Sequence, residues 1–122
     1  LLKNYNKKII LIDRFIDSTI AYQHYGMGIN LKIIKYINDY ILKNIKVNFT
    51  FLNIVNKKNL KIRLMKRKNL NRYDQFKFKF YTKVQNGFLK LSKVKKNYLI
   101  IDSNLSISHN KKIIINKVKK LI

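Results

Sequence analysis

Residues 13–23 read Asp-Arg-Phe-Ile-Asp-Ser-Thr-Ile-Ala-Tyr-Gln, and they follow an apolar run, Ile-Ile-Leu-Ile, at positions 9–12. A short, continuous apolar run is typical of a parallel strand that is buried on both faces. Asp13 and Arg14 would then stand at the carboxyl end of that strand, where open α/β sheets bind their ligands. The stretch therefore predicts an α/β protein with a charged pair at its binding edge.

The rest of the chain alternates between helical and strand patterns. In chain order we expect a strand at 9–12, a helix over 15–23, a loop at 25–28, a helix over 30–42, a strand at 47–55, helices over 56–66 and 73–94, a strand at 98–101 and a helix from 106 onward. Strands that alternate with helices in this way predict a parallel sheet with helical crossovers. No internal repeat or linker divides the sequence, so we expect residues 1–122 to form a single domain.

Local patterns add expectations about single residues. Asp17 and Ser18 are candidate caps for the first helix, and the glycines at 26 and 28 permit a positive φ. From the helical period, we expect apolar packing at Leu31, Ile34, Ile37, Ile41 and Leu42 in the second helix and at Ile113, Val118 and Leu121 in the last.

The composition excludes several classes of site. The chain of 122 residues contains no cysteine and two histidines, so neither a thiolate nor a histidine cluster is available for a metal ion. No apolar run approaches the length of a transmembrane helix. We therefore expect a cytoplasmic protein that has no contact with a membrane.

The net charge of +23 raises the question of a polyanion partner. One interpretation is a basic nucleic-acid-binding or ribosome-associated protein. Of the 28 basic residues, however, 24 are lysine and four are arginine, at positions 14, 63, 67 and 72. Lysine suffices as a point charge, whereas arginine is needed where a planar group binds an anion with two hydrogen bonds. Because the arginines fall within residues 13–23 and 63–74, we favour two anion-binding motifs over nucleic-acid binding.

The first of these motifs resembles a known family. Asp13-Arg14-Phe15 followed by Ser18-x-x-Ala21-Tyr22-Gln23 is similar to the signature of bacterial thymidylate kinases, and the likeness continues through residues 25–30. The resemblance implies a P-loop kinase-type three-layer α/β fold with a parallel sheet. The family's Gly-rich phosphate-binding loop is not found in these residues. We therefore expect the carboxy-terminal part of the family's chain, lacking the first strands, with the missing strand in the middle of the sheet.

The resemblance also implies roles for individual side chains. Arg14 would bind the phosphate of deoxythymidine monophosphate (dTMP), and Asp13 would organise the magnesium–phosphate centre through water. Thr19 would lie near the thymine, and Gln23 would contact the edge of the base. The ring of Tyr22 would pack under the sugar and leave no room for a ribose 2′-hydroxyl.

The second motif, residues 63–74, resembles the lid of the same family, with Asn71 in place of the usual aspartate. Arg63 and Arg67 are one helical turn apart and share a face. The resemblance implies that Arg63, Arg67 and Arg72 reach the phosphates of ATP. The dipeptide Asp102-Ser103 resembles, more weakly, the loop beside the adenine.

The implied activity is transfer of the γ-phosphoryl group of ATP to dTMP, with Mg²⁺, in a homodimeric enzyme; we expect the present chain alone to be inactive. A different nucleotide kinase of the same fold remains an alternative. Each site also has a structural alternative: an ion pair between strand and helix for Asp13 and Arg14, a core aromatic for Tyr22, and a solvated helix end for the lid arginines.

Overall fold

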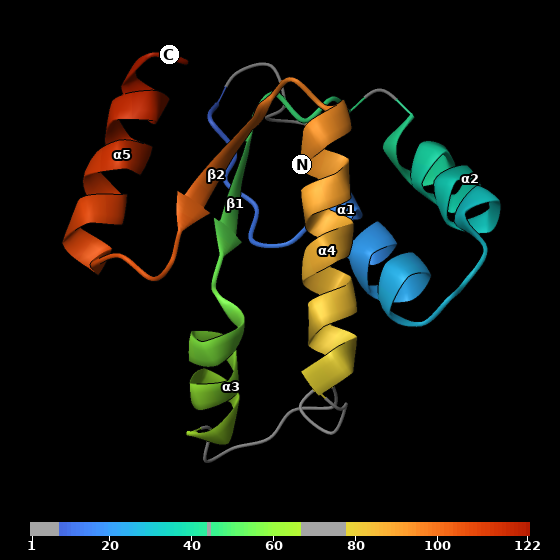
Figure 1. Ribbon diagram of the computed structural model, residues 1–122. Coiled ribbons are helices and arrows are strands. Elements are labelled where there is room, and N and C mark those ends of the chain that lie inside the picture. The colour runs from blue at the N-terminus through green and yellow to red at the C-terminus, as the bar shows by residue number, and fades with distance from the viewer. Residues whose placement is uncertain (1–7, 44, 67–77) are drawn as a thin grey trace.

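The computed structural model describes residues 8–43, 45–66 and 78–122. In chain order the elements are α1 (Ile16–Thr19), the π-helix η2 (Ile20–Gly26), α2 (Leu31–Leu42), β1 (Thr50–Ile54), α3 (Lys57–Met65), α4 (Phe78–Val94), β2 (Tyr98–Asp102) and α5 (Ile107–Lys119) (Figure 1). Within these ranges no helix has the length and apolar content that a membrane crossing requires.

The two strands form a parallel pair with an in-step register, from Thr50 opposite Tyr98 to Ile54 opposite Asp102. The chain passes from β1 to β2 by way of α3 and α4, and Figure 1 shows α4 to one side of the strands and α5 to the other. This arrangement confirms the predicted α/β class with parallel strands and helical crossovers.

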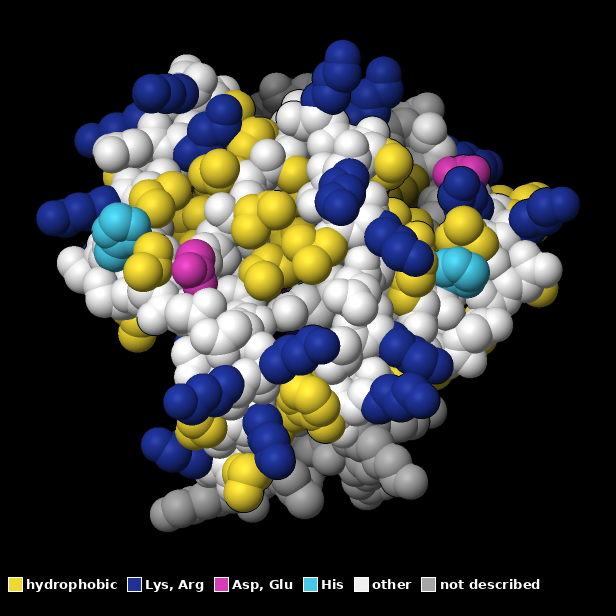
Figure 2. Space-filling model, viewed as in Figure 1, with side chains coloured by type: hydrophobic (Ala, Val, Ile, Leu, Met, Phe, Trp, Pro, Cys, Tyr) yellow, Lys and Arg dark blue, Asp and Glu magenta, His cyan; other side chains and the backbone are white. Residues whose placement is uncertain are grey.

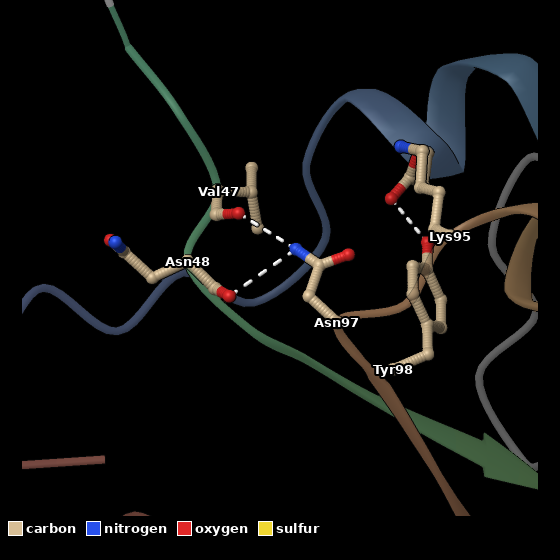
Figure 3. A network of polar contacts seen from close by, with 6 residues as sticks. Val47, Asn48, Lys95, Asn97 and Tyr98 are labelled. Carbon is tan, nitrogen blue, oxygen red and sulfur yellow. Dashed lines mark hydrogen bonds and ion pairs between the residues drawn. The ribbon is translucent and has the colours of Figure 1, made fainter.

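β1 is shorter than the strand predicted at 47–55. The side-chain amide of Asn97 donates to the carbonyl oxygens of Val47 and Asn48, at 2.8 and 3.3 Å (Figure 3). These side-chain bonds replace a backbone ladder at that end, and the ladder with β2 begins at Thr50.

The strand predicted at 9–12 is wrong. Residues 9–12 form no strand, and Ile9, Leu11 and Ile12 are 62%, 84% and 46% exposed. A strand requires a backbone partner, whereas β1 pairs with β2 in the described sheet, and a cavity of about 1050 Å³ has both β1 and residues 9–12 among its walls. Residues 9–12 have the apolar pattern of a strand, but no strand among the described residues pairs with their backbone.

The predicted first helix is confirmed, but it continues as η2 to Gly26, into the expected loop. Gly28 has the expected positive φ, +82°, whereas Gly26 is needed for another reason. A Cβ at Gly26 would lie 2.6 Å from Cε2 of Phe80, so glycine permits η2 to pack closely on α4. The cap prediction is wrong, because no side chain caps α1 at Phe15.

The hydrophobic core lies between η2 and α4. Ala21, Phe80 and Val84 are buried there, and Tyr22, Tyr81 and Phe88 pack against them. In the predicted helix over 73–94, residues 73–77 lie outside the described ranges, and α4 accounts for the remainder.

Two predicted apolar faces need correction. In α2, Ile34 is buried, but Ile37 and Ile41 are 48% and 67% exposed, because the helix turns a narrower face, including Asn38, toward the protein.

In α5, Ile113 and Val118 are half-buried and Leu121 is exposed. Ser106 caps this helix: its hydroxyl oxygen accepts a 3.2 Å hydrogen bond from the backbone N–H of His109. Leu121 lies beyond the end of the helix at Lys119.

Candidate functional site

α1 and η2 bring four of the predicted site residues around one small pocket. Arg14, Thr19, Tyr22 and Gln23, together with Ser18, line a cavity of about 170 Å³. The spacing explains this grouping, since Ser18, Thr19, Tyr22 and Gln23 recur after three and four residues along a continuous helical segment. The pocket therefore combines a guanidinium group, hydroxyl groups, an aromatic ring and an amide.

Ser18 is the pocket residue to which the sequence assigned no binding role. It belongs to the signature quoted above and is a candidate helix cap, yet it lies one turn before Tyr22 and lines the pocket. Its spacing of four residues from Tyr22 is the signal that indicates its position.

The backbone of Arg14 lies in the left-handed region, with φ of +61°. This conformation is uncommon for a residue other than glycine and costs roughly 1–3 kcal/mol, so the surrounding structure must hold it in place. The conformation turns the chain sharply between residues 9–12 and α1 and carries the Arg14 side chain to the pocket.

The guanidinium of Arg14 lies over the ring of Tyr22, with 5.3 Å between Cζ and the ring centroid. A cation over an aromatic face at this range is attracted by about 0.5–1 kcal/mol at an exposed site. The five N–H donors of a guanidinium lie in its plane, so they point past the edge of the ring beneath it. They are therefore available to an anion in the pocket.

Side chains of α4 hold the ring of Tyr22 in place. It contacts Phe80 and Phe88 edge-to-face, with centroid distances of 5.9 and 6.5 Å. Such pairs contribute about 0.5–1.5 kcal/mol beyond the area that they bury. Tyr22 therefore packs against the core, as its structural alternative predicts, and also lines the pocket.

Gln23 supplies a polar atom that lacks a partner. Its Oε1 is buried, and no other described residue donates a hydrogen bond to it. A buried acceptor of this kind costs roughly 1–3 kcal/mol when it remains unpaired. Since Gln23 lines the pocket, a ligand with an N–H donor at its edge is a suitable partner.

Asp13 lies beside the pocket and is not part of its lining. Its carboxylate is exposed and lines the larger cavity of about 1050 Å³, which Arg14 and Ser18 also reach. Within the described ranges no three His, Cys, Asp or Glu side chains gather into a group that could hold a metal ion. A single exposed carboxylate does fit Mg²⁺, which proteins usually hold with one or two carboxylates, water and substrate phosphates.

The lid arginines have a separate position. Arg63 lines neither cavity, and its guanidinium donates to the carbonyl oxygen of Ser103 at 2.6 Å. Arg67 and Arg72 lie outside the described residues. The structure therefore places Arg63 against the Asp102-Ser103 segment and does not bring it to the pocket around Arg14.

Polar side chains form hydrogen bonds with the Asp102-Ser103 segment at the carboxyl ends of the two strands. Oδ1 of Asp102 accepts from the backbone and side-chain N–H groups of Asn104, at 2.8 and 2.6 Å. Asn104 in turn accepts from the side chain of Asn59, at 2.9 Å, and Asn110 donates to the backbone of Asp102. The end of β2, the start of α3 and α5 are thus joined at the edge where such sheets bind ligands.

An ion pair anchors the helical segment that carries the pocket. Lys95 Nζ lies 2.6 Å from Oδ1 of Asp17, and the hydroxyl of Tyr98 donates to Oδ2 (Figure 3). Burial raises the pKa of Tyr98 above its usual value, and the hydrogen bond to Asp17 adds to the effect. These contacts connect α1 to the start of β2.

A parallel pair of strands joined by helices, with further helices packed beside them, defines a protein of the α/β class. Comparison with known proteins gives the family. The family model described as "Thymidylate kinase" matches residues 2–114. The chain therefore belongs to the thymidylate kinase family, which has the P-loop kinase fold.

Curated relatives agree with this assignment. A thymidylate kinase of Sulfurihydrogenibium sp. is 39% identical over 114 residues, which cover 92% of this chain and 54% of the relative. One from Trichodesmium erythraeum is 38% identical over 98 residues (80% and 44%), and one from Ehrlichia ruminantium is 37% identical over 123 residues (94% and 56%). The chain spans about half the length of the curated relatives that it matches.

The family assignment favours the kinase interpretation of the arginine motifs over nucleic-acid binding. On the face drawn in Figure 2, lysine and arginine side chains are spread around the described residues, with apolar side chains in the middle. A nucleic-acid site would gather its basic side chains into one patch or stripe.

Proposed function

We propose that this chain is part of a cytoplasmic enzyme that transfers the γ-phosphoryl group of ATP to dTMP and yields dTDP, with Mg²⁺. The observation that carries the proposal is the pocket of about 170 Å³ that Arg14, Thr19, Tyr22 and Gln23 share. The single domain expected over residues 1–122 is part of the same proposal.

Arg14 binds the phosphate of dTMP in this proposal. A guanidinium group offers paired donors that match phosphate oxygens. The stack on Tyr22 supports the role, because it restricts the side chain before the ligand arrives. Pre-organisation of this kind lowers the entropy cost of binding.

Gln23 and Thr19 bind the base. The buried Oε1 of Gln23 accepts the N3–H of thymine, which satisfies an acceptor that is otherwise unpaired. Tyr22 packs under the sugar. Its ring cannot move aside easily, because Phe80 and Phe88 hold it, and this supports the exclusion of a 2′-hydroxyl.

Phosphoryl transfer needs alignment of the reacting groups and positive charge around the developing transition state. Bound Mg²⁺ would supply positive charge at the phosphates. Asp13 holds its hydration shell, and Arg63, Arg67 and Arg72 contact the phosphates of ATP. For Arg63 this requires release from the Ser103 carbonyl. The 122 residues contain no Gly-x-x-x-x-Gly-Lys-Ser/Thr sequence to hold those phosphates, so we propose that the chain alone is inactive.

The binding half of the proposal is tested by calorimetry on the chain with dTMP, dUMP, dCMP and thymidine. We expect dTMP to bind most tightly. Arg14→Lys should lower the affinity for dTMP by about tenfold, because lysine cannot form the bidentate contact. The affinity for thymidine should not change. Arg63→Lys is the matched control, since Arg63 lines neither cavity, and should bind dTMP as the wild type does. Equal affinity for all four ligands would contradict the proposal.

The inactivity is tested by ADP release from the purified chain with ATP, Mg²⁺ and dTMP. We expect no dTMP-dependent release. Clear turnover would show that these residues hold ATP without the Gly-rich loop.

The homodimer belongs to the same proposal, and the outer face of α2 is its candidate surface. Five apolar side chains are exposed there: Ile33, Tyr36, Ile37, Tyr40 and Ile41. Tyr36→Glu with Tyr40→Glu should reduce self-association in sedimentation velocity, whereas Lys32→Glu with Lys35→Glu, on exposed polar positions of the same helix, is the matched control. Unchanged self-association in the tyrosine variant would exclude this surface.

A further inference from the structure

The helical segment that carries the pocket ends in an irregular turn. η2 is a π-helix of seven residues, and the backbone N–H of Met27 donates to the carbonyl oxygen of Tyr22, five residues earlier, at 3.0 Å. Turns of this kind are rare in helices and occur frequently at functional sites. The turn contains Tyr22 and Gln23, which line the pocket around Arg14.

The carbonyl oxygen of Gln23 accepts a hydrogen bond that an α-helix would not supply. In an α-helix it would accept from the N–H of Met27, four residues later. Here it accepts from the N–H of Ile29 at 2.9 Å, whereas Met27 donates to the carbonyl oxygens of Tyr22 and His24. The backbone of Gln23 is therefore held by a residue that lies beyond the end of η2.

His24 holds Ile29 in the position that this bond requires. Its ring nitrogen Nδ1 lies 2.9 Å from the carbonyl oxygen of Ile29. Since a carbonyl oxygen can only accept, Nδ1 carries a proton and donates. Gln23 and His24, which are adjacent in the sequence, thus bind the N–H and the C=O of the same residue.

The ring of His24 is restrained by α4 through Tyr25. The two rings meet edge-to-face, with 4.7 Å between their centroids. Tyr25 lies so close to Gly87 of α4 that a Cβ there would be 2.5 Å from Cδ2 of the tyrosine ring. Nζ of Lys90, also on α4, lies 5.4 Å from the centroid of the same ring. The His24 donor is therefore directed at Ile29 by contacts with the core helix.

We propose that His24 is a positioning residue for Gln23, because its bond to Ile29 maintains the π-helical turn that places Gln23 at the pocket. The side chain of Ile29 is 41% exposed, so packing alone holds this residue weakly. Without the His24 bond, Ile29 moves away, and the carbonyl of Gln23 turns to Met27 as in an α-helix. The buried Oε1 of Gln23 then leaves its place in the pocket.

The consequence for ligand recognition rests on the proposed function, in which Oε1 of Gln23 accepts from N3–H of thymine. Cytosine has an acceptor at N3 and cannot donate there. His24 therefore contributes, through Gln23, to the preference for thymine over cytosine. The effect of His24 on Gln23 itself is independent of any ligand.

Three variants separate the donor of His24 from its ring. His24→Phe keeps a ring beside Tyr25 and removes the donor, whereas His24→Asn keeps an N–H near the position of Nδ1 and removes the ring. His109→Phe, at an exposed position on α5, is the matched control. All three are compared with the wild type by NMR without ligand, through amide hydrogen exchange at Ile29 and the signals of the Gln23 side-chain NH₂ group.

In His24→Phe we expect exchange at Ile29 to be at least about tenfold faster and the Gln23 signals to shift. In His24→Asn both should return toward the wild-type values, and in His109→Phe both should be unchanged. Wild-type exchange and signals in His24→Phe would overturn the proposal. It would also be overturned if His24→Asn behaved as His24→Phe does, because the ring and not the donor would then be responsible.

Calorimetry with dTMP and dCMP measures the consequence for the base. The preference for dTMP should fall by about tenfold in His24→Phe, as expected for the loss of one hydrogen bond, and should be restored in His24→Asn. A variant that only loses stability would bind both ligands less and keep their ratio. An unchanged ratio in His24→Phe would overturn the role in recognition. If the wild type itself shows no preference for dTMP, the proposed function fails, and the NMR comparison still decides the role of His24.

Discussion

Lys95 and Asp17 form an ion pair, with Nζ 2.6 Å from Oδ1, although they are 78 positions apart in the sequence. The carboxylate is almost completely buried, and the hydroxyl of Tyr98 bonds its second oxygen. This contact fixes the position of α1, and hence of the pocket around Arg14, relative to the strands.

Loss of this carboxylate should destabilise the protein. Asp17→Ala leaves Lys95 and the hydroxyl of Tyr98 without their shared acceptor, and hydrogen bonds to charged groups contribute about 1.5–3 kcal/mol. We therefore expect the free energy of unfolding in urea to fall by about 2 kcal/mol. Asp39→Ala, at an exposed position on α2, is the control and should change it by less than about 0.5 kcal/mol.

Stability should fall at alkaline pH through Tyr98. Burial, and then the bond to Asp17, raise the pKa of this tyrosine in the folded state above its usual value of about 10. Above pH 10 or so the unfolded chain therefore loses the Tyr98 proton while the folded chain retains it, and stability decreases as pH rises. Below that pH, Tyr98 is protonated in both states and contributes no pH dependence.

Tyr98→Phe isolates this effect from the other titrating side chains. The difference in unfolding free energy between wild type and variant should be constant below about pH 9 and should shrink above about pH 10. A difference that stays constant across the alkaline range would show that the pKa of Tyr98 is not raised.

The two glycines that flank Met27 should respond differently to alanine. A Cβ at Gly26 would lie 2.6 Å from the Phe80 ring and 3.0 Å from Val84, so Gly26→Ala should cost about 1–3 kcal/mol through overpacking. Gly28→Ala meets nothing within 4 Å but must adopt a φ of +82°, which costs about 1–2 kcal/mol. NMR shifts of the Phe80 ring distinguish the causes: they should change in Gly26→Ala and not in Gly28→Ala.

Gln23→Met should have opposite effects on stability and on binding. Methionine has a similar shape and removes a buried acceptor that lacks a partner, so the free energy of unfolding should not fall and should rise by up to about 1 kcal/mol. The affinity for dTMP, measured by calorimetry, should fall by about tenfold or more. If the free energy of unfolding falls in step with the affinity, Gln23 has a structural role instead.

The role of Tyr22 is tested by comparing ligands that differ only in the sugar. Tyr22→Ala should reduce the preference for dTMP over the ribonucleotide with the same base, because the space for a 2′-hydroxyl is restored. Tyr22→Phe keeps the ring on Phe80 and Phe88 and should keep the preference. An unchanged preference in the alanine variant would place the sugar elsewhere.

Local patterns in the sequence predicted most of the elements, because a helical period or a short β-branched run depends on residues that are close together. The helices α2 to α5 and β2 lie where the periodicity indicated, with deviations of a few residues at their ends. The grouping of Thr19, Tyr22 and Gln23 agrees with helical spacing, whereas Arg14 reaches the pocket through its left-handed backbone conformation. The roles expected for all four came from a family resemblance.

Features that depend on distant residues could not be predicted in this way. The run at 9–12 carries the pattern of a strand, but whether it forms one depends on a pairing partner. The ends of β1 depend on the side chain of Asn97, and the π-helical continuation depends on close packing between Gly26 and Phe80. The bond between Arg63 and Ser103 joins residues 40 positions apart, and no local pattern indicates it.

The side chain of Asn97 has a wider consequence. By donating to the carbonyl oxygens of Val47 and Asn48, it takes the place of a backbone N–H in a neighbouring strand. The two carbonyl oxygens are therefore satisfied although no backbone N–H of β2 faces them. One asparagine amide thus ends the ladder between β1 and β2 without leaving a polar group unpaired at its last rung.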